Sequence, residues 1–596
     1  MNKKNYVAVA TLAFAMLTSC AGQKEAKSTS GIDLANMDTT VSAGTDFFRY
    51  ACGGWNDAHP LTAEYSRYGT FDELFENSQK QLRELIEGLA AQKNNQAGSA
   101  AQKIGDLYNM AMDSVTLNKQ GAEPVKAMLD KIAGMKDKSE IVPMMTEMAH
   151  IGIGTYFHSY VYADPKNSSL NIFQMGQGGI NLGEKEYYLD TDSITQNIRE
   201  QYKLYIGKLF QLAGFSEADA QQKVADVMEI ETAIAKVSRS ATELRDPEAN
   251  YHKMSFDAGI DWDAYMKGLG IQAPAELNVE QVEPIQEVAR LMNTLPLSKH
   301  VSYLEYNLLD AAASCLSDDF VAARFDFYGK VLSGRQVNQP RWKRAVNSVN
   351  GMLGELVGEM YVEKYFPAAA KERMVKLVKN LQTALGERID AQEWMSDSTK
   401  IRAHEKLATF HVKVGYPDKW KDYSKLEIKN DSYWANVCRA SEWGFNDMYS
   451  RIGKPVDKDE WLMTPQTVNA YYNPSTNEIC FPAAILQPPF FNMEADDAAN
   501  YGAIGVVIGH EMTHGFDDQG RQFDKDGNLT DWWAPGDADR FKERAQVMVD
   551  FFNKIEVLPG LQANGELTLG ENLADHGGLN VAYLAFQNAT KDAPLG

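Results

Sequence analysis

Residues 506–514 read Val-Val-Ile-Gly-His-Glu-Met-Thr-His, an apolar run that leads into the pattern His-Glu-x-x-His. On an α-helix, residues four positions apart lie on one face, so His510 and His514 can present two imidazoles to one metal ion. Zn²⁺ is the ion typical of this pattern, and Glu511 projects beside it, where it can take a proton from a zinc-bound water. The stretch therefore predicts a buried helix with two zinc ligands and a general base. The alternative is a pair of core histidines beside a surface glutamate.

A catalytic zinc ion usually has three protein ligands and one open position, so a third ligand is needed. One class of zinc hydrolase supplies a His ten residues after the first, but this chain has Gly520 there, which excludes that class. Segment 570–575 reads Gly-Glu-Asn-Leu-Ala-Asp, in which Glu571 and Asp575 share one helix face. We expect Glu571 to bind the zinc. We expect Asp575 to accept a hydrogen bond from the far nitrogen of a ligand histidine.

Asp517, three residues after His514, is a second candidate for such an outer hydrogen bond. We count Asp575 with Glu511 among the catalytic residues, because it fixes the tautomer of a ligand histidine and raises its basicity. The alternatives are a solvated acidic face for Glu571 and Asp575, and a surface or helix-end acid for Asp517.

The composition of the whole chain is that of an ordinary globular protein. It has 596 residues, of which 44% are hydrophobic, and 81 Asp and Glu residues against 59 Lys and Arg residues give a net charge of −22. No Lys- or Arg-rich stretch offsets this charge, so we expect no nucleic-acid partner. After residue 20 no segment is apolar enough to cross a membrane.

The N-terminus has the layout of an export signal. Lys3 and Lys4 precede an apolar run at 7–16, and Leu-Thr-Ser-Cys follows at 17–20, which resembles the bacterial lipobox. We expect residues 1–19 to be removed, Cys20 to carry the lipid, and residues 20–42 to form a tether. The expected protein is an exported bacterial lipoprotein of the cell envelope, on its periplasmic face or outer surface, that touches the membrane only through this anchor. The alternative is an ordinary signal peptide with a chance cysteine.

Four further cysteines remain, Cys52, Cys315, Cys438 and Cys480. An exported protein can form disulfides, but the wide spacing indicates no cysteine-based zinc site. We expect mostly buried thiols.

Apolar residues recur at helical spacing over most of the chain. The expected helices include 71–89, 199–213, 219–238, 370–390 and 538–555, and short alternating runs at 155–162 and 409–414 predict strands. The fold class is therefore mainly α with small β elements. Composition alone places no domain boundary.

Beyond these patterns, long ordered segments resemble one family, the neprilysin and endothelin-converting enzyme family of zinc metallopeptidases (gluzincins), and within it the bacterial oligopeptidase O type. Besides the zinc helix and the Glu571 helix, the segments that carry the resemblance are FFRYACGGW at 47–55, SRYGTFD at 66–72, GEKEYYL at 183–189, VNAYY at 468–472 and FPAAILQPPFF at 481–491.

The resemblance implies a fold of two lobes that enclose a central cavity. Mapped by analogy, residues 43–72 form an N-terminal strip of the catalytic lobe, residues 73–430 form a helical covering lobe, and residues 431–596 complete the catalytic lobe. The family also has a C-terminal stretch with a His that stabilises the oxyanion and an Arg near the substrate, and this sequence ends before it. We therefore expect the sequence to be a fragment whose activity is weak or absent.

The resemblance also implies substrate-binding residues. Asn469 and the carbonyl of Ala470 match the pair that hydrogen-bonds the substrate backbone, and Phe490 and Val507 match walls of the pocket for the residue after the cut. Arg67 matches an arginine that meets a substrate's free C-terminus, with a structural salt bridge as the alternative.

Together these features predict a zinc-dependent metalloendopeptidase with one Zn²⁺ per chain. It would hydrolyse oligopeptides with a preference for a large apolar residue after the cut, with Glu511 activating the zinc-bound water. One alternative is a catalytically impaired peptide-binding or adhesion lipoprotein on the same scaffold, and another is a zinc hydrolase of non-peptide amides. The physiological peptide and the oligomeric state stay open.

Overall fold

Most of the chain folds into helices, and the five segments predicted to be helical are all helices. The computed structural model describes residues 30–255 and 259–592. The predicted helices are α3 (Thr70–Ala90), α9 (Ser193–Leu212), α10 (Glu217–Ala235), α17 (Ala368–Asp390) and α22 (Asp537–Phe552). Both predicted strands are present as β1 (Phe157–Asp164) and β5 (His411–Gly415). The fold class, mainly α with small β elements, is confirmed.

Several helices begin directly after a residue whose side chain caps the first turn. The side chains of Asp192 and Ser216 accept hydrogen bonds from the first backbone amides of α9 and α10, which have no partner inside the helix. In α3, the buried residues Leu74, Leu82 and Ile86 recur at helical spacing, so one face packs on the core while charged residues face the solvent.

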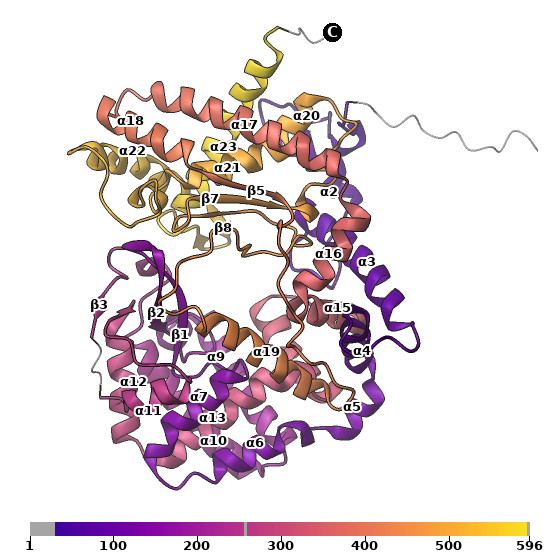
Figure 1. The fold of residues 1–596 in the computed structure, drawn as a ribbon, viewed down its shortest axis with the longest axis vertical. Coiled ribbons are helices and arrows are strands. Elements are labelled where there is room, and N and C mark those ends of the chain that lie inside the picture. Colours follow the sequence, from indigo (N-terminus) through magenta and orange to yellow (C-terminus); the bar gives the residue numbers. More distant parts are fainter. Residues whose placement is uncertain (1–29, 256–258, 593–596) are drawn as a thin grey trace, which may run out of the picture.

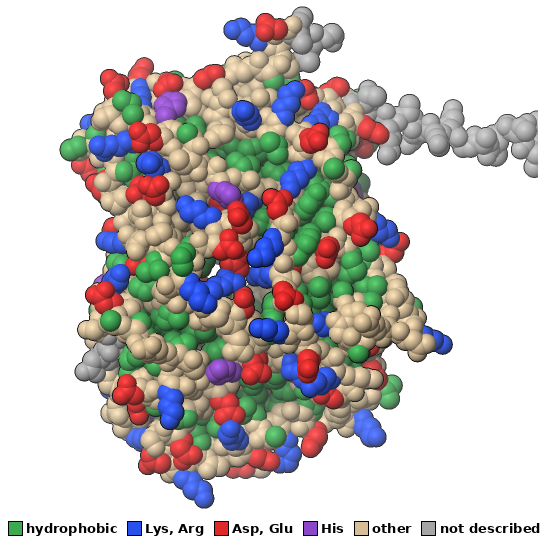
Figure 2. Space-filling model, in the orientation of Figure 1, with side chains coloured by type: hydrophobic (Ala, Val, Ile, Leu, Met, Phe, Trp, Pro, Cys, Tyr) green, Lys and Arg blue, Asp and Glu red, His purple; other side chains and the backbone are tan. Residues whose placement is uncertain are grey.

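Figure 1 shows two lobes, one above the other, and the space-filling view in Figure 2 shows a hollow between them. The covering lobe holds α9, α10 and the following helices: α4 (Ala100–Met112), α5 (Ser114–Gln120), α6 (Glu123–Ala133), α7 (Ile141–His150), α8 (Glu186–Leu189), α11 (Trp262–Gly268), α12 (Val282–Thr294), α13 (Leu297–Ala312), α14 (Asp318–Arg324), α15 (Arg341–Met352) and α19 (Tyr433–Tyr449). Its sheet has the order β1-β2-β4-β3, with β2 (Asn167–Gln177), β3 (Lys253–Met254) and β4 (Leu277–Val279).

The catalytic lobe lies above the hollow in Figure 1 and holds α17, α22 and the remaining helices: α2 (Phe47–Ala58), α18 (Asp397–Ala408), α20 (Asp497–Gly502), α21 (Ile504–His514) and α23 (Leu569–Thr590). Its sheet has the order β5-β7-β6, with β6 (Tyr471–Asn473) and β7 (Glu478–Pro482), and β8 (Glu556–Leu558) pairs with β9 (Leu561–Gln562). Helices α3 and α16 (Gly354–Tyr365) pack together beside the hollow and connect the lobes.

The family resemblance implied a lobe boundary near residue 430, and the elements on either side of this residue pack in a different way. Strand β5 pairs in parallel with β7, and α17 packs against α21 and α23, so residues 368–415 belong to the catalytic lobe. Helix α19 packs against α7 and β1 and so belongs to the covering lobe. The observed packing therefore divides the chain differently from the boundary at 430 that the resemblance implied, because long-range strand pairing and helix packing decide the division.

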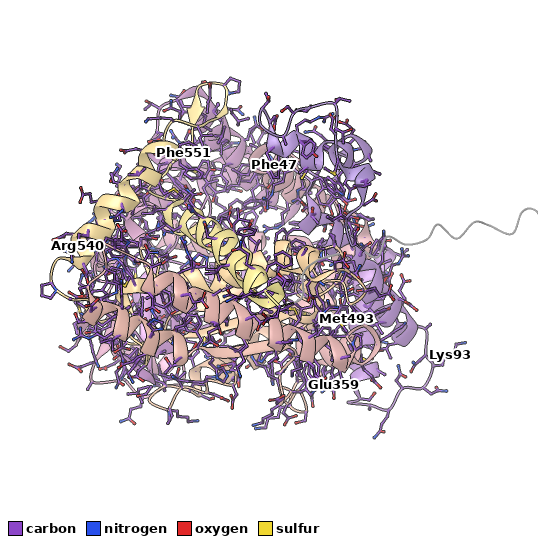
Figure 3. All side chains as sticks on the ribbon, turned by 90° about the horizontal axis from the view of Figure 1, so that it is seen from above. Phe47, Lys93, Glu359, Met493, Arg540 and Phe551 are labelled. Carbon is purple, nitrogen blue, oxygen red and sulfur yellow. The ribbon has the colours of Figure 1, made fainter. Side chains whose placement is uncertain are left out.

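Figure 2 shows Lys, Arg, Asp and Glu side chains gathered around the hollow between the lobes. Seen from above in Figure 3, the yellow helix α23 lies beside the salmon helix α17, in agreement with their contacts. Among the described residues, none of the helices has the length and apolar character needed to cross a bilayer. Cys52, Cys315, Cys438 and Cys480 are all free thiols, two of them buried and two half-buried.

Candidate metal centre and active site

Helix α21 carries the His-Glu-x-x-His pattern in the interior of the catalytic lobe. Ile504, Ile508 and Met512 are fully buried, so the apolar run that precedes the motif anchors the helix in the core. Glu511 is also buried, at 7% exposed, which contradicts the alternative of a surface glutamate.

Glycines set the distance between α21 and α23. A Cβ atom on Gly578 would lie 2.6 Å from the carbonyl oxygen of Val506 and 2.7 Å from the amide nitrogen of His510. A Cβ atom on Gly509 would lie 2.8 Å from the carbonyl oxygen of Gly578. Only glycine allows backbones to approach this closely, so the two helices are in direct contact where the motif lies.

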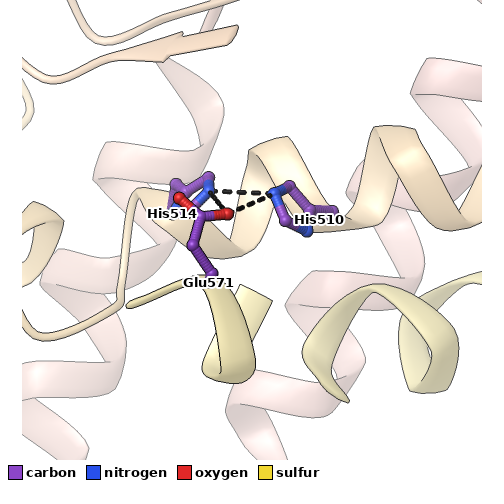
Figure 4. A group of neighbouring side chains, drawn as sticks. All are labelled: His510, His514 and Glu571. Carbon is purple, nitrogen blue, oxygen red and sulfur yellow. Dashed lines mark hydrogen bonds and ion pairs between the residues drawn. The ribbon is translucent and has the colours of Figure 1, made fainter. Parts of the chain in front are cut away.

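This contact brings the three predicted ligands together, as Figure 4 shows. The Nε2 atoms of His510 and His514 are 3.0 Å apart, and Oε2 of Glu571 lies 3.3 Å from the first and 3.6 Å from the second. Two tetrahedral ligands of Zn²⁺, each at about 2.0–2.1 Å, are separated by about 3.3–3.4 Å. The donor set and its spacing therefore fit a zinc ion. Among the described residues, these three form the group of His, Cys, Asp and Glu side chains suited to hold a metal.

Both predicted outer hydrogen bonds are present. Nδ1 of His510 donates to Asp575 at 2.8 Å, and Nδ1 of His514 donates to Asp517 at 2.7 Å. Because each histidine uses Nδ1 for its outer hydrogen bond, its other ring nitrogen, Nε2, faces the centre of the ligand group and can bind a metal there. Asp517 is buried and also accepts hydrogen bonds from the backbone amide of Gly520, so the turn after α21 fixes its position.

The charges at the site shift several pKa values. Burial lowers the pKa of both histidines, but the carboxylates hydrogen-bonded to them outweigh it and raise the pKa of His510 to about 9 and of His514 to about 10. Hydrogen bonds from the same histidines lower the pKa of Glu571. Burial raises the pKa of Glu511 to about 7, while the two histidines and the backbone amide of Tyr472 oppose the rise. Glu511 is thus a desolvated carboxyl group beside the metal-binding atoms.

A cavity of about 390 Å³ lies directly over the ligand group. Its lining residues are Asn469, Ala470, Tyr471, Tyr472, Pro474, His510, Glu511, His514, Asp517, Gln519, Gly520 and Glu571. Asn469 is exposed and lies two residues before strand β6, which is an edge strand of its sheet. An edge strand has free backbone groups that can pair with an extended peptide. The structure thus brings Asn469 and Ala470 into the same cavity as the ligand group.

The other residues predicted from the resemblance lie outside this lining. Phe490 contacts Phe71 with ring centroids 4.7 Å apart, and its carbonyl accepts a hydrogen bond from Ile504 at the start of α21. Val507 is half-buried one turn before Glu511 on α21. Arg67 is exposed and forms no ion pair with the described part of the chain, so its structural alternative, a salt bridge, is not present. Cys20 lies outside the described residues.

Sequence reasoning missed Lys406 on α18. This lysine is fully buried, and its Nζ donates to the carbonyls of Gly515, Gly520 and Phe523, each at 2.7 Å. It therefore holds together the loop that follows α21 and contains Asp517. Burial lowers the pKa of Lys406 to about 7. One feature of the sequence could have revealed it. Lys406 lies at helical spacing from Ala403 and Thr399, and the helix face that these residues share is otherwise buried.

Comparisons with known proteins agree with this geometry. The sequence profiles of peptidase family M13 match residues 43–417 and residues 469–595. Endothelin-converting enzyme 1 of Rattus norvegicus is 34% identical over 589 residues, which cover 94% of this chain and 76% of that enzyme.

Solved structures are similar as well. The zinc metalloprotease Zmp1 of Mycobacterium tuberculosis in complex with an inhibitor matches with a TM-score of 0.91 and 37% identity, covering 95% of this chain and 88% of that one. The same protease in an open state gives a TM-score of 0.73, covering 91% and 86%. PepO from Lactobacillus rhamnosis gives a TM-score of 0.82 with 25% identity, covering 90% and 85%. With both halves of the chain matched, this protein belongs to peptidase family M13, the metallopeptidase family of neprilysin and the endothelin-converting enzymes.

Proposed function

We propose that this chain is a zinc-dependent endopeptidase that hydrolyses oligopeptides in the hollow between its lobes. The observation that carries the proposal is the convergence of His510, His514 and Glu571, with the buried Glu511 beside them and a cavity over them. When bound, Zn²⁺ supplies a Lewis acid that polarises the scissile carbonyl and makes water more acidic.

The chain's own residues supply the proton transfers and the positioning. Glu511 accepts a proton from the attacking water and passes it to the leaving amine. Asp575 and Asp517 hold the imidazoles in the tautomer and orientation that ligation needs. Because Glu511 is buried, its proton transfers occur away from bulk water.

The substrate is an extended peptide that pairs with the free edge of β6. Asn469 and the carbonyl of Ala470 hydrogen-bond its backbone. This mode of binding recognises main-chain groups, which are the same in every peptide, rather than particular side chains. Phe490 and Val507 form an apolar pocket for the residue after the cut. A large apolar side chain is therefore preferred at that position.

The lobes separate to admit the peptide and close around it. In support, the chain superposes better on the inhibitor complex of the mycobacterial protease, with a TM-score of 0.91, than on its open state, with 0.73. A hollow between two lobes accepts short flexible peptides but not folded proteins.

Cys20 anchors the protein to the cell envelope after export. A Cys20→Ser variant is then expected to lose incorporation of a labelled fatty acid and to leave the membrane fraction. Unchanged labelling of this variant would refute the anchor and leave the peptidase proposal intact.

The alternative of an impaired peptide-binding lipoprotein is disfavoured, because every residue of the ligand group and its outer hydrogen bonds is present and in place. The test is cleavage of a quenched fluorescent peptide of about ten residues by a protein that includes the full C-terminal stretch of the family, followed by mass spectrometry of the products. We expect internal cleavage, loss of activity on chelation, and recovery with Zn²⁺. Stoichiometric zinc with no cleavage would favour the impaired alternative.

A further inference from the structure

We propose that Arg245 is a positioning residue for the metal centre: it is carried by the covering lobe and braces the two metal-binding segments of the catalytic lobe only when the lobes are closed. The inference rests on the proposed function, since it assigns a role in closure to that same site. It also predicts effects on metal binding that can be measured without any peptide substrate.

Arg245 joins the covering lobe to the loop that follows α21. Its Nη2 donates to both carboxylate oxygens of Asp518, at 2.8 and 3.0 Å, and its carbonyl accepts a hydrogen bond from the side-chain amide of Gln519. Asp518 and Gln519 directly follow Asp517, which orients His514. The covering lobe therefore holds the loop that positions a metal ligand.

The same guanidinium lies beside the start of α23, so close that only glycine fits there. A Cβ atom on Gly570 would lie 2.7 Å from Nη2 of Arg245, 3.0 Å from Asp517 and 3.1 Å from Asp518. Gly570 immediately precedes the ligand Glu571. Arg245 thus lies where the segment with the third ligand meets the segment with the first two: it is bonded to the loop after α21 and lies against the start of α23.

The contact is partly desolvated and charged. Side chains of Arg245 and Asp518 are only 21% and 22% exposed. Burial and the neighbouring Asp517 carboxylate raise the pKa of Asp518, and the guanidinium of Arg245 opposes this rise. Removing Arg245 therefore leaves two adjacent, half-desolvated carboxylates without this counter-charge, and mutual repulsion would displace them.

The segment that carries Arg245 is rigid enough to act as a brace. Arg245 ends a short helical turn, η3 (Glu243–Arg245), and the side-chain amide of Asn250 donates to three backbone carbonyls around it, those of Glu243, Leu244 and Asp246. Lys185 pairs with Glu243 at 3.0 Å, which ties the turn to the covering lobe. Movement of the covering lobe therefore carries Arg245 with it.

A second bridge between the lobes provides a matched control. The hydroxyl of Ser168, on the β1–β2 hairpin, donates to the carbonyl of Asp526 at 2.7 Å, and its amide donates to the side chain of Asn528 at 2.9 Å. This bridge joins the same two lobes through uncharged groups and does not touch the metal-binding segments. A variant that removes this bridge therefore shows the effect of weaker closure alone, without a direct effect on the metal centre.

The experiment compares Arg245→Met, Arg245→Lys, Asp518→Asn and the double variant Arg245→Met/Asp518→Asn with Ser168→Ala. Three quantities are measured in the zinc-loaded protein: the rate of zinc loss to a chelator, the distribution of lobe-to-lobe distances by pulsed EPR of two spin labels, and kcat and KM for a quenched peptide. Arg245→Met is expected to open the lobes, to speed zinc loss about tenfold, and to lower kcat by about tenfold or more.

The other variants test the charge of Arg245, its pairing with Asp518 and the effect of closure separately. Arg245→Lys keeps the charge without the planar guanidinium, so it should recover part of the loss. The double variant should be no worse than Arg245→Met, because the two side chains act as a pair. Ser168→Ala should change the distance distribution and KM while leaving zinc loss and kcat unchanged.

Unchanged zinc loss and kcat in Arg245→Met would overturn the proposal, as would equal effects of Ser168→Ala on both. If the unmodified protein binds zinc but cleaves no peptide, the proposed function fails. Zinc loss and lobe distances still decide the role of Arg245 in that case.

Discussion

Glu511 is one residue from a metal ligand on the same helix, yet it faces the cavity and is buried. In the proposed mechanism this carboxylate transfers protons without contributing to the ligand group. Its neighbours His510 and His514 are held by separate acids, so a change at 511 should leave the metal site intact.

Glu511→Gln therefore separates chemistry from metal binding. We expect kcat for a quenched peptide to fall by about 10²–10⁴-fold, because the amide cannot accept the proton. Zinc content, measured by atomic emission, should stay at one ion per chain. Turnover that survives in a zinc-loaded variant would mean that another group is the base.

Asp575 allows a similar test of the outer hydrogen bonds. It is 78% exposed on α23, so Asp575→Asn should not disturb the fold. The amide is a weaker partner for Nδ1 of His510, and we expect zinc affinity to fall about 10–100-fold in a chelator competition. Equal affinity of variant and parent would show that the exposed carboxylate contributes nothing to ligation.

At the scale of elements, the contact between α21 and α23 decides whether the ligands meet. The sequence predicts both helices from their motifs, but the distance between them depends on Gly509 and Gly578 fitting against each other. The three ligands come from two helices, so this spacing is part of the metal site.

Gly578→Ala is expected to force the helices apart, because the new Cβ would meet the backbone of Val506 and His510 at 2.6 and 2.7 Å. Glu571 would then move away from the histidines, and we expect zinc affinity to fall at least about tenfold. Gly444→Ala on α19 is the control, since its Cβ would meet nothing within 4 Å and alanine favours a helix. Similar zinc binding in both variants would contradict this role of the helix contact.

Lys406 connects α18 to the loop after α21. In Lys406→Met the carbonyls of Gly515, Gly520 and Phe523 lose their shared donor, at a cost of about 1–3 kcal/mol for each one left unpaired. We expect faster amide hydrogen exchange in residues 515–523 and faster loss of zinc. Lys400→Met, on the same helix but near the surface, is the control. Unchanged exchange in the loop would contradict the role of Lys406.

At the scale of the whole molecule, a buried histidine in the covering lobe, His300, makes the folding stability depend on pH. His300 is fully buried; Tyr156 donates a hydrogen bond to its Nδ1 at 2.7 Å, and its Nε2 donates to the carbonyl of Leu291. This arrangement satisfies the neutral imidazole. Burial lowers the pKa of His300 to about 4 from an ordinary value of 6.5.

Stability should therefore decrease in acid. Between about pH 6.5 and pH 4 the unfolded chain binds a proton at His300 that the folded chain does not. The stability from this group is complete above pH 6.5 and is lost as the pH falls to about 4, by ~3 kcal/mol at most. Urea unfolding at several pH values should show a shallower slope for His300→Gln. The same slope in both proteins would mean that other groups cause the acid sensitivity.

The sequence predicted the helices of this protein but not the lobe to which each of them belongs. Helical spacing predicted α3, α9, α10, α17 and α22 with ends within six residues, because amphipathic periodicity depends on residues close together in the sequence. It did not assign α17, α18 and β5 to the catalytic lobe. That assignment depends on the pairing of β5 with β7, more than sixty residues away in the chain.

The sequence by itself determined the chemistry of the site: the spacing of His510, His514 and Glu511 on one helix face, and of Glu571 and Asp575 on another, predicts the metal, the base and the outer acid. These are local patterns, fixed by 3.6 residues per turn. Only the tertiary structure decided that the two helices touch through glycines, that Lys406 holds the adjacent loop, and that Arg245 reaches the site from the other lobe. The physical reason is that these contacts join residues far apart in the chain, and packing alone brings such residues together.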